Sequence, residues 1–285
     1  MRIMKNLTVV ISVLLPLLFS CNDPGLLEEK GKLDLKEVSG LEYIPNSGLW
    51  ALEDSGNYNK LYTIDEKGSI LKTYTVANAK NNDWEDLASD AMGNLYIGDF
   101  GNNDNKRRDL AIYKLNAGKY DSIAAKVEFY YPGQKAFPPK KSEMLYDAEA
   151  FFEHNGTFYI FTKNRSKEFD GSFAMYSVPN AEGRHEAKLM ASLKSCGNYN
   201  KCAITAADIS PDGKTAVLLS GDKIWLMPGF GDGNYELQPV ELGFITQKEG
   251  LAFKDADVLF VADEKDKHAG GRLYETKLSI LKAKI

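Results

Sequence analysis

The stretch NDWEDLASDAMGNLYIGDFGNN (residues 82–103) contains two short apolar runs on either side of the turn residues Met92-Gly93-Asn94. Two more runs follow it, LAIYKL (110–115) and KVEFYYP (126–132). Short runs rich in Val, Ile, Tyr, Phe and Trp, separated by turn residues, are typical of antiparallel β-strands. These residues are therefore predicted to form one four-stranded sheet.

The phrase that opens this unit recurs along the chain. Its five copies, SGLEY, EDLAS, EAFFE, TAADIS and EGLAF, begin at Ser39, Glu85, Glu149, Thr205 and Glu249. These anchors are 46, 64, 56 and 44 residues apart, and further apolar runs follow each of them. Such lengths fit a four-stranded propeller blade better than a solenoid coil of roughly 20 to 30 residues. We predict an all-β fold, a five-bladed β-propeller of four-stranded antiparallel blades. Six blades are the alternative if an insertion hides another sheet, and a β-sandwich is less favoured.

The fifth copy ends after RLYETKLSIL (272–281), one strand short of a complete blade. LLEEKGKLDL (26–35), before the first copy, can supply the missing outer strand and close the ring. Closure removes exposed sheet edges, which otherwise pair with other chains.

The N-terminus has the features of a secretory signal, namely Arg2 and Lys5, an apolar run over residues 7–19 and the small residue Ser20. Leu18-Phe19-Ser20-Cys21 resembles the bacterial lipobox, which implies that Cys21 is lipidated and becomes the mature N-terminus. A simple membrane span is the alternative, but about 13 apolar residues fall short of the roughly 20 that cross a bilayer.

These features divide the chain into a signal peptide (1–20), a lipidated tether (21–30) and a propeller domain (31–285). We expect an exported protein that is anchored by lipid to the cell envelope, at the outer membrane. The net charge is −5 and there is no basic block. Nucleic acid is therefore an unfavourable partner, because binding its backbone needs concentrated Lys and Arg.

The segment CGNYNKC contains Cys196 and Cys202. In an oxidising compartment, two cysteines this close in a polar loop favour a disulfide. The alternative is half of a metal site, for which the chain offers only the three histidines His154, His185 and His268.

In a propeller the first strand of each blade lines the central channel, so the five anchors are expected at one level around a funnel. Ser39, Glu85, Glu149, Thr205 and Glu249 would then face one another. Carboxylates at such short distances raise one another's pKa unless a cation neutralises them. Hard oxygen ligands of this kind suit Ca²⁺ or Mg²⁺. We predict such a cation there. The alternative is that each Glu bonds to backbone N–H groups and pins adjacent blades.

Two further sets of residues are predicted to face the funnel as a ligand-binding surface. The first set lies two residues before the anchors and comprises Glu37, Asp83 and Asp147. The second set follows the second strands and comprises Asp54, Asp99, Lys163, Arg165 and Asp263. The expected occupant of this surface is a small polar ligand or a protein.

The phrases DSGN, NDWEDLA, IGDFGNN, TAADISPDGK and KEGLAF resemble a family of uncharacterised bacterial exported β-propeller lipoproteins. More distantly, glutamates at an axial opening are similar to those of the calcium-dependent apyrases. That resemblance implies Ca²⁺ at Glu85, Glu149 and Glu249 and hydrolysis of nucleotide phosphates. The basic residues available to hold several phosphates are few: Lys163, Arg165 and the pair Arg107-Arg108.

No GxSxG, HExxH, P-loop or GxGxxG motif occurs in the sequence. We therefore expect a membrane-tethered propeller that binds a ligand or protein at its funnel. The alternative is a metal-dependent hydrolase of phosphate esters or related small polar substrates.

Overall fold

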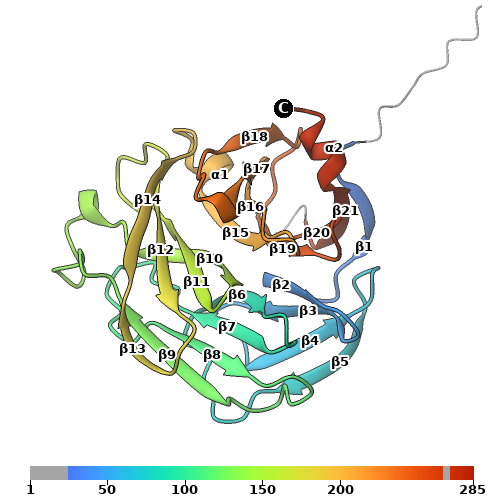
Figure 1. Cartoon of the computed structure of the whole chain (residues 1–285), viewed down its shortest axis with the longest axis horizontal. Coiled ribbons are helices and arrows are strands. Elements are labelled where there is room, and N and C mark those ends of the chain that lie inside the picture. The colour runs from blue at the N-terminus through green and yellow to red at the C-terminus, as the bar shows by residue number, and fades with distance from the viewer. Residues whose placement is uncertain (1–24, 266–269) are drawn as a thin grey trace, which may run out of the picture.

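The computed structural model describes residues 25–265 and 270–285. Within these ranges the strands form five sheets around a central axis (Figure 1). The predicted five-bladed β-propeller is confirmed. The predicted signal peptide and the lipobox cysteine, Cys21, lie outside the described residues.

Each blade is built on four antiparallel strands, which in blades 1 to 4 run outward from the axis in chain order. Blade 1 comprises β2 (Val38–Ile44), β3 (Gly48–Glu53), β4 (Lys60–Ile64) and β5 (Ile70–Thr75). Blade 2 comprises β6 (Trp84–Ser89), β7 (Leu95–Asp99), β8 (Ala111–Leu115) and β9 (Ala125–Tyr130). Blade 3 comprises β10 (Asp147–His154), β11 (Thr157–Lys163), β12 (Ser172–Pro179) and β14 (Lys188–Lys194). Blade 4 comprises β15 (Ile204–Ile209), β16 (Thr215–Ser220), β17 (Lys223–Pro228) and β18 (Gln238–Glu241).

Blade 5 closes the ring with strands from both ends of the described chain. It comprises β19 (Lys248–Phe253), β20 (Val258–Asp263), β21 (Arg272–Lys277) and, outermost, β1 (Glu28–Lys32). β1 pairs antiparallel with β21, from Glu28 opposite Glu275 to Lys32 opposite Arg272. The N-terminal segment therefore supplies the missing strand as predicted. The strand begins at Glu28, within the stretch 21–30 expected to be a tether.

Blade 2 has a fifth strand that the repeat did not predict. β13 (Gly183–Glu186), from the connection between β12 and β14 of blade 3, pairs parallel with β9, placing Arg184 beside Glu128. Figure 1 shows it at the outer edge of that sheet. The edge of blade 2 is thus covered by its neighbour.

The apolar core is divided into five clusters, and each cluster joins two neighbouring blades. Between blades 1 and 2, for example, the Trp50 ring lies 4.5 Å from the Tyr120 ring, centroid to centroid. Between blades 2 and 3, Phe100 meets Phe151 edge to face at 5.2 Å. Because each blade packs on two others, ring closure buries both faces of every sheet.

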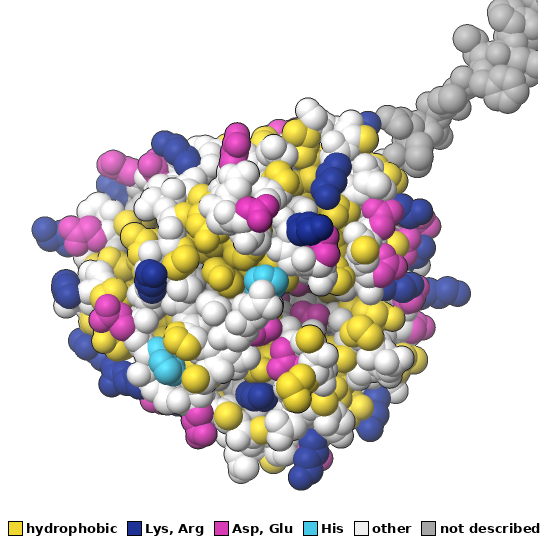
Figure 2. All heavy atoms as spheres, viewed as in Figure 1, with side chains coloured by type: hydrophobic (Ala, Val, Ile, Leu, Met, Phe, Trp, Pro, Cys, Tyr) yellow, Lys and Arg dark blue, Asp and Glu magenta, His cyan; other side chains and the backbone are white. Residues whose placement is uncertain are grey.

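The few helices are short: η1 (Lys141–Glu143), α1 (Tyr199–Cys202), η2 (Phe230–Asp232) and α2 (Leu278–Lys282). None in the described part of the chain has the length and apolar character needed to cross a membrane. Figure 2 shows charged side chains of both signs spread over one face, with acidic side chains visible at its hollowed centre.

Candidate functional site

The central funnel contains a cavity of about 860 Å³. Eight of the residues predicted to face the funnel line this cavity: Asp54, Asp83, Glu85, Glu149, Lys163, Arg165, Thr205 and Glu249. They come from all five blades or from the loops beside them. The repeat in the sequence therefore marks one shared site.

The anchors reach the funnel through a β-bulge in each innermost strand. In every blade the register between the first and second strands skips one residue, and the five skipped residues are Ser39, Glu85, Glu149, Thr205 and Glu249. A bulged residue has no partner across the ladder, and the local bend can redirect its side chain. The predicted equivalence of the five anchors thus has a backbone cause.

Two of the anchors pin neighbouring blades. The Ser39 hydroxyl donates to the backbone carbonyl of Glu85 at 2.7 Å, and the Thr205 hydroxyl donates to that of Lys248. Ser39 does not line the cavity. Carboxylates other than the anchors also link blades. Asp86 and Asp208, for example, accept from the backbone N–H groups of the next blade's Phe151 and Phe253. The alternative role considered for the anchor glutamates is filled by these residues instead.

On the blade 3 side, the acidic groups are matched by cations. Glu149 accepts from both Lys163 and Arg165, and Arg165 also donates to Asp147 at 2.6 Å. Burial alone would lower the pKa of Lys163, but the charge of Glu149 holds it above its usual value. This side of the funnel is a closed ion-pair network.

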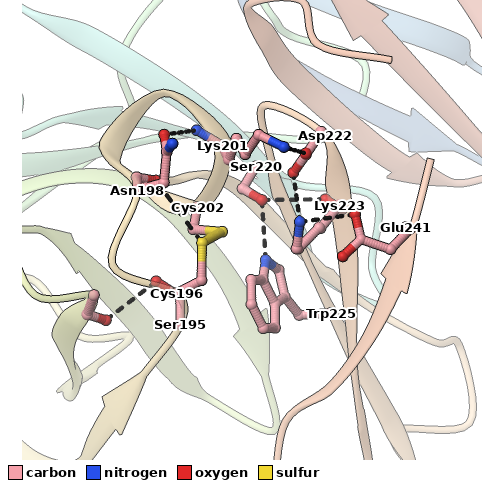
Figure 3. The surroundings of a disulfide bond; sticks show 11 residues. Ser195, Cys196, Asn198, Lys201, Cys202, Ser220, Asp222, Lys223, Trp225 and Glu241 are labelled. Carbon is pink, nitrogen blue, oxygen red and sulfur yellow. Dashed lines mark hydrogen bonds and ion pairs between the residues drawn. A yellow bond between two sulfur atoms is a disulfide. The ribbon is translucent and has the colours of Figure 1, made fainter. Parts of the chain in front are cut away.

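A helical turn completes that network. α1 places the Tyr199 hydroxyl where it accepts from Arg165. The turn is held by the Cys196–Cys202 disulfide (S–S 2.05 Å), which confirms that prediction, and by Lys201, whose ammonium lies 3.2 Å from Asp222 (Figure 3). The disulfide therefore supports a residue of the funnel wall.

Elsewhere around the funnel, in blades 1, 2 and 5, the carboxylates have no such cationic partner among the described residues. Burial, and then the charges of Glu149 and Asp83, raise the pKa of Glu85 well above its usual value. Burial and the charge of Glu149 raise the pKa of Glu249 to about 8. The pKa of Asp54 is raised to about 6, chiefly by burial and by Glu37. This part of the funnel holds more negative charge than its surroundings compensate.

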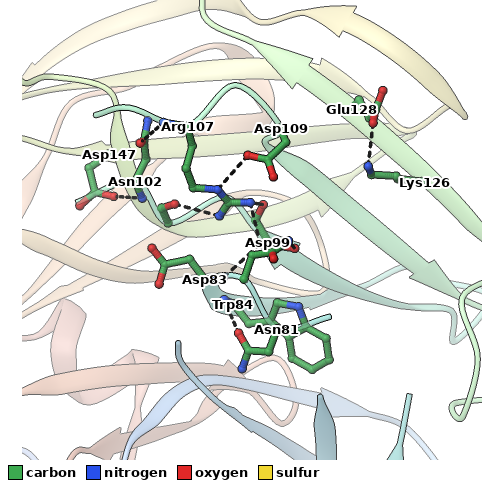
Figure 4. A network of polar contacts seen from close by, with 12 residues as sticks. Asn81, Asp83, Trp84, Asp99, Asn102, Arg107, Asp109, Lys126, Glu128 and Asp147 are labelled. Carbon is green, nitrogen blue, oxygen red and sulfur yellow. Dashed lines mark hydrogen bonds and ion pairs between the residues drawn. The ribbon is translucent and has the colours of Figure 1, made fainter. Parts of the chain in front are cut away.

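Besides Ser39, four predicted funnel residues lie elsewhere. Asp147 is fully buried behind Arg165, and Glu37 is exposed and accepts from the Asn57 amide at 2.8 Å. Asp99 and Asp263 are fully buried beneath the funnel wall. Asp99 binds Arg107 at 2.9 Å, in the network of Figure 4. Asp263 accepts from the backbone N–H of Arg272 and the hydroxyl of Tyr274.

The strand register explains the error for Asp99 and Asp263. Asp99 and Asp263 pair with Trp84 and Lys248, each of which stands one residue before an anchor. The equivalent residue of blade 3 is Thr162, which pairs with Ala148. A shift of one residue along a strand moves a side chain to the other face. The residue one position later lines the cavity, namely Asp54, Lys163 and Glu264 in blades 1, 3 and 5. Glu264, whose pKa burial and Asp54 raise to about 7, was missed for this reason.

The phrases NDWEDLA and IGDFGNN of blade 2 also have a structural basis. The N–H of Asp83 donates to Asp99, and that of Trp84 donates to the Asn81 side chain, as Figure 4 shows. A Cβ on Gly101 would lie 1.9 Å from a Glu85 carboxylate oxygen and 2.5 Å from Asp83. Glycine at this position therefore leaves room for the two carboxylates where they lie.

Sequence reasoning also missed Lys248. This fully buried lysine lines the cavity, and its ammonium donates to the carbonyls of Gly221 and Phe244 and to the Thr246 hydroxyl. Burial lowers its pKa to about 8. The available signal was its position: it stands one residue before the anchor, where the other copies have Val38, Trp84, Ala148 and Ile204.

Within residues 25–265 and 270–285, no group of three or more His, Cys, Asp or Glu side chains is arranged to hold a metal ion. The predicted Ca²⁺ or Mg²⁺ at the anchors stays a prediction. The metal-dependent hydrolase, which requires that ion, stays a prediction as well.

No protein-family model and no curated protein matches the chain. Solved propellers are similar in fold. Virginiamycin B lyase of Staphylococcus aureus is 15% identical with a TM-score of 0.41, over 85% of this chain and 66% of the lyase, just under two thirds of its length. The PQQ-bound aldose sugar dehydrogenase of Streptomyces coelicolor is 10% identical with a TM-score of 0.49, over 88% and 96%.

A chain of a nidogen/laminin complex is 12% identical with a TM-score of 0.50, over 84% of each chain. At such identities the likeness shows the β-propeller fold and nothing finer. The resemblances to exported lipoproteins and to apyrases stay predictions.

Proposed function

We propose that the protein is a ligand-binding β-propeller, tethered to a membrane through Cys21, whose funnel binds a small polar ligand that carries positive charge. One observation carries this proposal. Six acidic side chains line the cavity against three basic ones. Two of those basic groups, Lys163 and Arg165, are already paired with Glu149. The third, Lys248, donates to neutral oxygens.

The arrangement of the unpaired carboxylates favours an organic cation over a bare ion. Asp54, Glu85 and Glu249 belong to three different blades around a cavity of about 860 Å³. Calcium requires roughly 6–8 oxygens at about 2.3–2.6 Å from one point. A ligand with two or more ammonium groups can reach separate carboxylates, because each N–H donates in its own direction. Ca²⁺ and Mg²⁺, the cations predicted at the anchors, belong in the same test.

Binding of a cation is expected to release protons. The pKa values of Glu249 and Glu264 are raised to about 8 and about 7, so both carry protons for much of the time at neutral pH. A positive charge beside a carboxylate favours its ionised form. Proton release is therefore a signature of binding in this part of the funnel.

The test is calorimetric titration of the purified chain at pH 7 with 1,4-diaminobutane, spermidine, Ca²⁺ and Mg²⁺, in two buffers of different ionisation enthalpy. We expect binding of a diamine or polyamine with net proton release, weakened by about tenfold in Glu249→Gln. Glu236→Gln, which changes an exposed carboxylate outside the cavity, is the matched control. Absence of binding by all four probes, or unchanged affinity in Glu249→Gln, contradicts the proposal.

The membrane tether has its own test. Cys21→Ala is expected to abolish incorporation of a fatty-acid label and to release the protein from membranes. A variant that still partitions with membranes to the same extent would show that Cys21 is not the anchor.

A further inference from the structure

A second cavity lies on blade 2. Its volume is about 330 Å³, and among the described residues none lines both this cavity and the funnel. We call it the blade-2 hollow. Its lining joins the end of β9 and the strand β13 with the segment that follows β9, residues 131–137. The hollow thus forms where blade 3 covers the edge of blade 2.

The wall of the hollow is largely aromatic. Phe129 and Tyr131 are buried, and their rings meet edge to face at a centroid distance of 5.6 Å. Tyr130 and Phe137 are more accessible and also line the hollow. Flat apolar walls of this kind bind planar rings by stacking and by removal of apolar surface from water.

Two arginines lie over aromatic rings of this wall. The guanidinium of Arg108 is 3.8 Å from the centroid of Phe137, and that of Arg184 is 5.4 Å from the centroid of Tyr130. A cation–π contact leaves the N–H groups of a guanidinium able to donate. Both arginines are exposed and remain available to an anion.

The rim of the blade-2 hollow has an excess of basic side chains, whereas the funnel has an excess of acidic ones. Arg107 is paired with Asp99 at 2.9 Å and with Asp109 at 3.1 Å. In the described chain, no carboxylate forms an ion pair with the other three basic residues of the lining, Arg108, Lys135 and Arg184. The acidic residue of the lining, Glu186, accepts from the Tyr130 hydroxyl. A protein with a net charge of −5 therefore has a local positive rim here.

We propose that the blade-2 hollow binds a small anion with a planar ring. The ring lies against the aromatic wall, and the carboxylate, sulfonate or phosphate group accepts hydrogen bonds from Arg108 and Arg184. Apolar contact alone would accept neutral rings equally well, and charge alone would accept inorganic anions. The combination of arginines and aromatic rings selects ligands that have both features.

The experiment uses two fluorescent probes with the full chain: 8-anilinonaphthalene-1-sulfonate, an anion with a planar naphthalene ring, and N-phenyl-1-naphthylamine, which lacks the sulfonate. We expect saturable binding of the anion at one site and binding of the neutral probe that is weaker by at least about tenfold. Equal affinity for the two probes would overturn the proposal without any variant.

Arg108→Ala/Arg184→Ala should weaken binding of the anionic probe by at least about tenfold. Both arginines are exposed, so the thermal melt should not change. Lys72→Ala is the matched control, because its ammonium lies 4.3 Å from the Tyr74 ring centroid but outside the hollow. Unchanged binding in the double variant, or an equal loss in Lys72→Ala, would overturn the site. The funnel is not involved, so neither result bears on the proposed function.

Discussion

Glu85 and Glu149 occupy the same β-bulge in neighbouring blades, yet their surroundings are opposite. Glu149 pairs with Lys163 and Arg165, whereas no side chain of the described residues donates to the Glu85 carboxylate. The difference arises at the end of the second strand and in the loop that follows it. Blade 3 has TKNR there, and blade 2 has DFGN, with Gly101 against Glu85. The repeat determines where an anchor lies, and the loop determines its partner.

The largest effect is expected from Glu149→Gln. This substitution leaves the ammonium of Lys163, whose side chain is 8% exposed, without its carboxylate. Removal of one partner from a buried ion pair costs about 3–5 kcal/mol. Urea unfolding of the variant should show that its free energy of unfolding is lower than that of the wild type by this amount. Glu149→Gln/Lys163→Met should regain much of it, because the unpaired charge is then gone. A loss below about 1 kcal/mol would mean that the network is not a stabilising unit.

A second prediction concerns the disulfide, which supports the blade 3 side of the funnel. Reduction of Cys196–Cys202 frees the turn that carries Tyr199, the partner of the Arg165 guanidinium. A short loop contributes about 2 kcal/mol through the entropy of the unfolded chain. Urea unfolding with and without dithiothreitol measures the difference, and intact mass under non-reducing conditions verifies the bond. Two free thiols in the native protein would contradict this prediction.

Much of the fold could be predicted because a propeller repeats its pattern. The five anchor phrases marked equivalent positions in the five blades, and the incomplete fifth copy pointed to β1 as the closing strand. The side chains beyond the anchors were predicted less well. Asp99 and Asp263 were placed in the funnel through an alignment that was one residue out of register, and Glu264 was missed. Acidic residues in sequence such as VADE cannot be told apart by composition, because strand register alone determines which one faces the cavity.

The unpaired side of the funnel is expected to make stability depend on pH. The folded pKa of Glu249 is about 8, raised from an unfolded value of about 4.3. The folded state therefore binds more protons, so this contribution to stability is complete below the unfolded pKa and is lost as the pH rises through 8. The free energy of unfolding, measured with urea, should be lower at pH 8 than at pH 5.5.

Glu249→Gln should reduce that fall by at least about 1 kcal/mol, since one pKa unit corresponds to about 1.4 kcal/mol. The comparison within one pH series separates this residue from the other buried carboxylates, which the variant retains. Stability that rises from pH 5.5 to pH 8 in the wild type would show that the funnel carboxylates are already compensated.

The smallest effect is expected from Glu85→Gln, the same substitution at the equivalent bulge. Here it removes a negative charge that burial, Glu149 and Asp83 already disfavour. No cation is left behind, so the free energy of unfolding should change by less than about 1 kcal/mol or increase slightly. Binding of a cationic ligand should weaken even so, because Glu85 lines the cavity. A loss of stability comparable to that of Glu149→Gln would show that Glu85 has a partner of its own, and the distinction between the two sides of the funnel would fail.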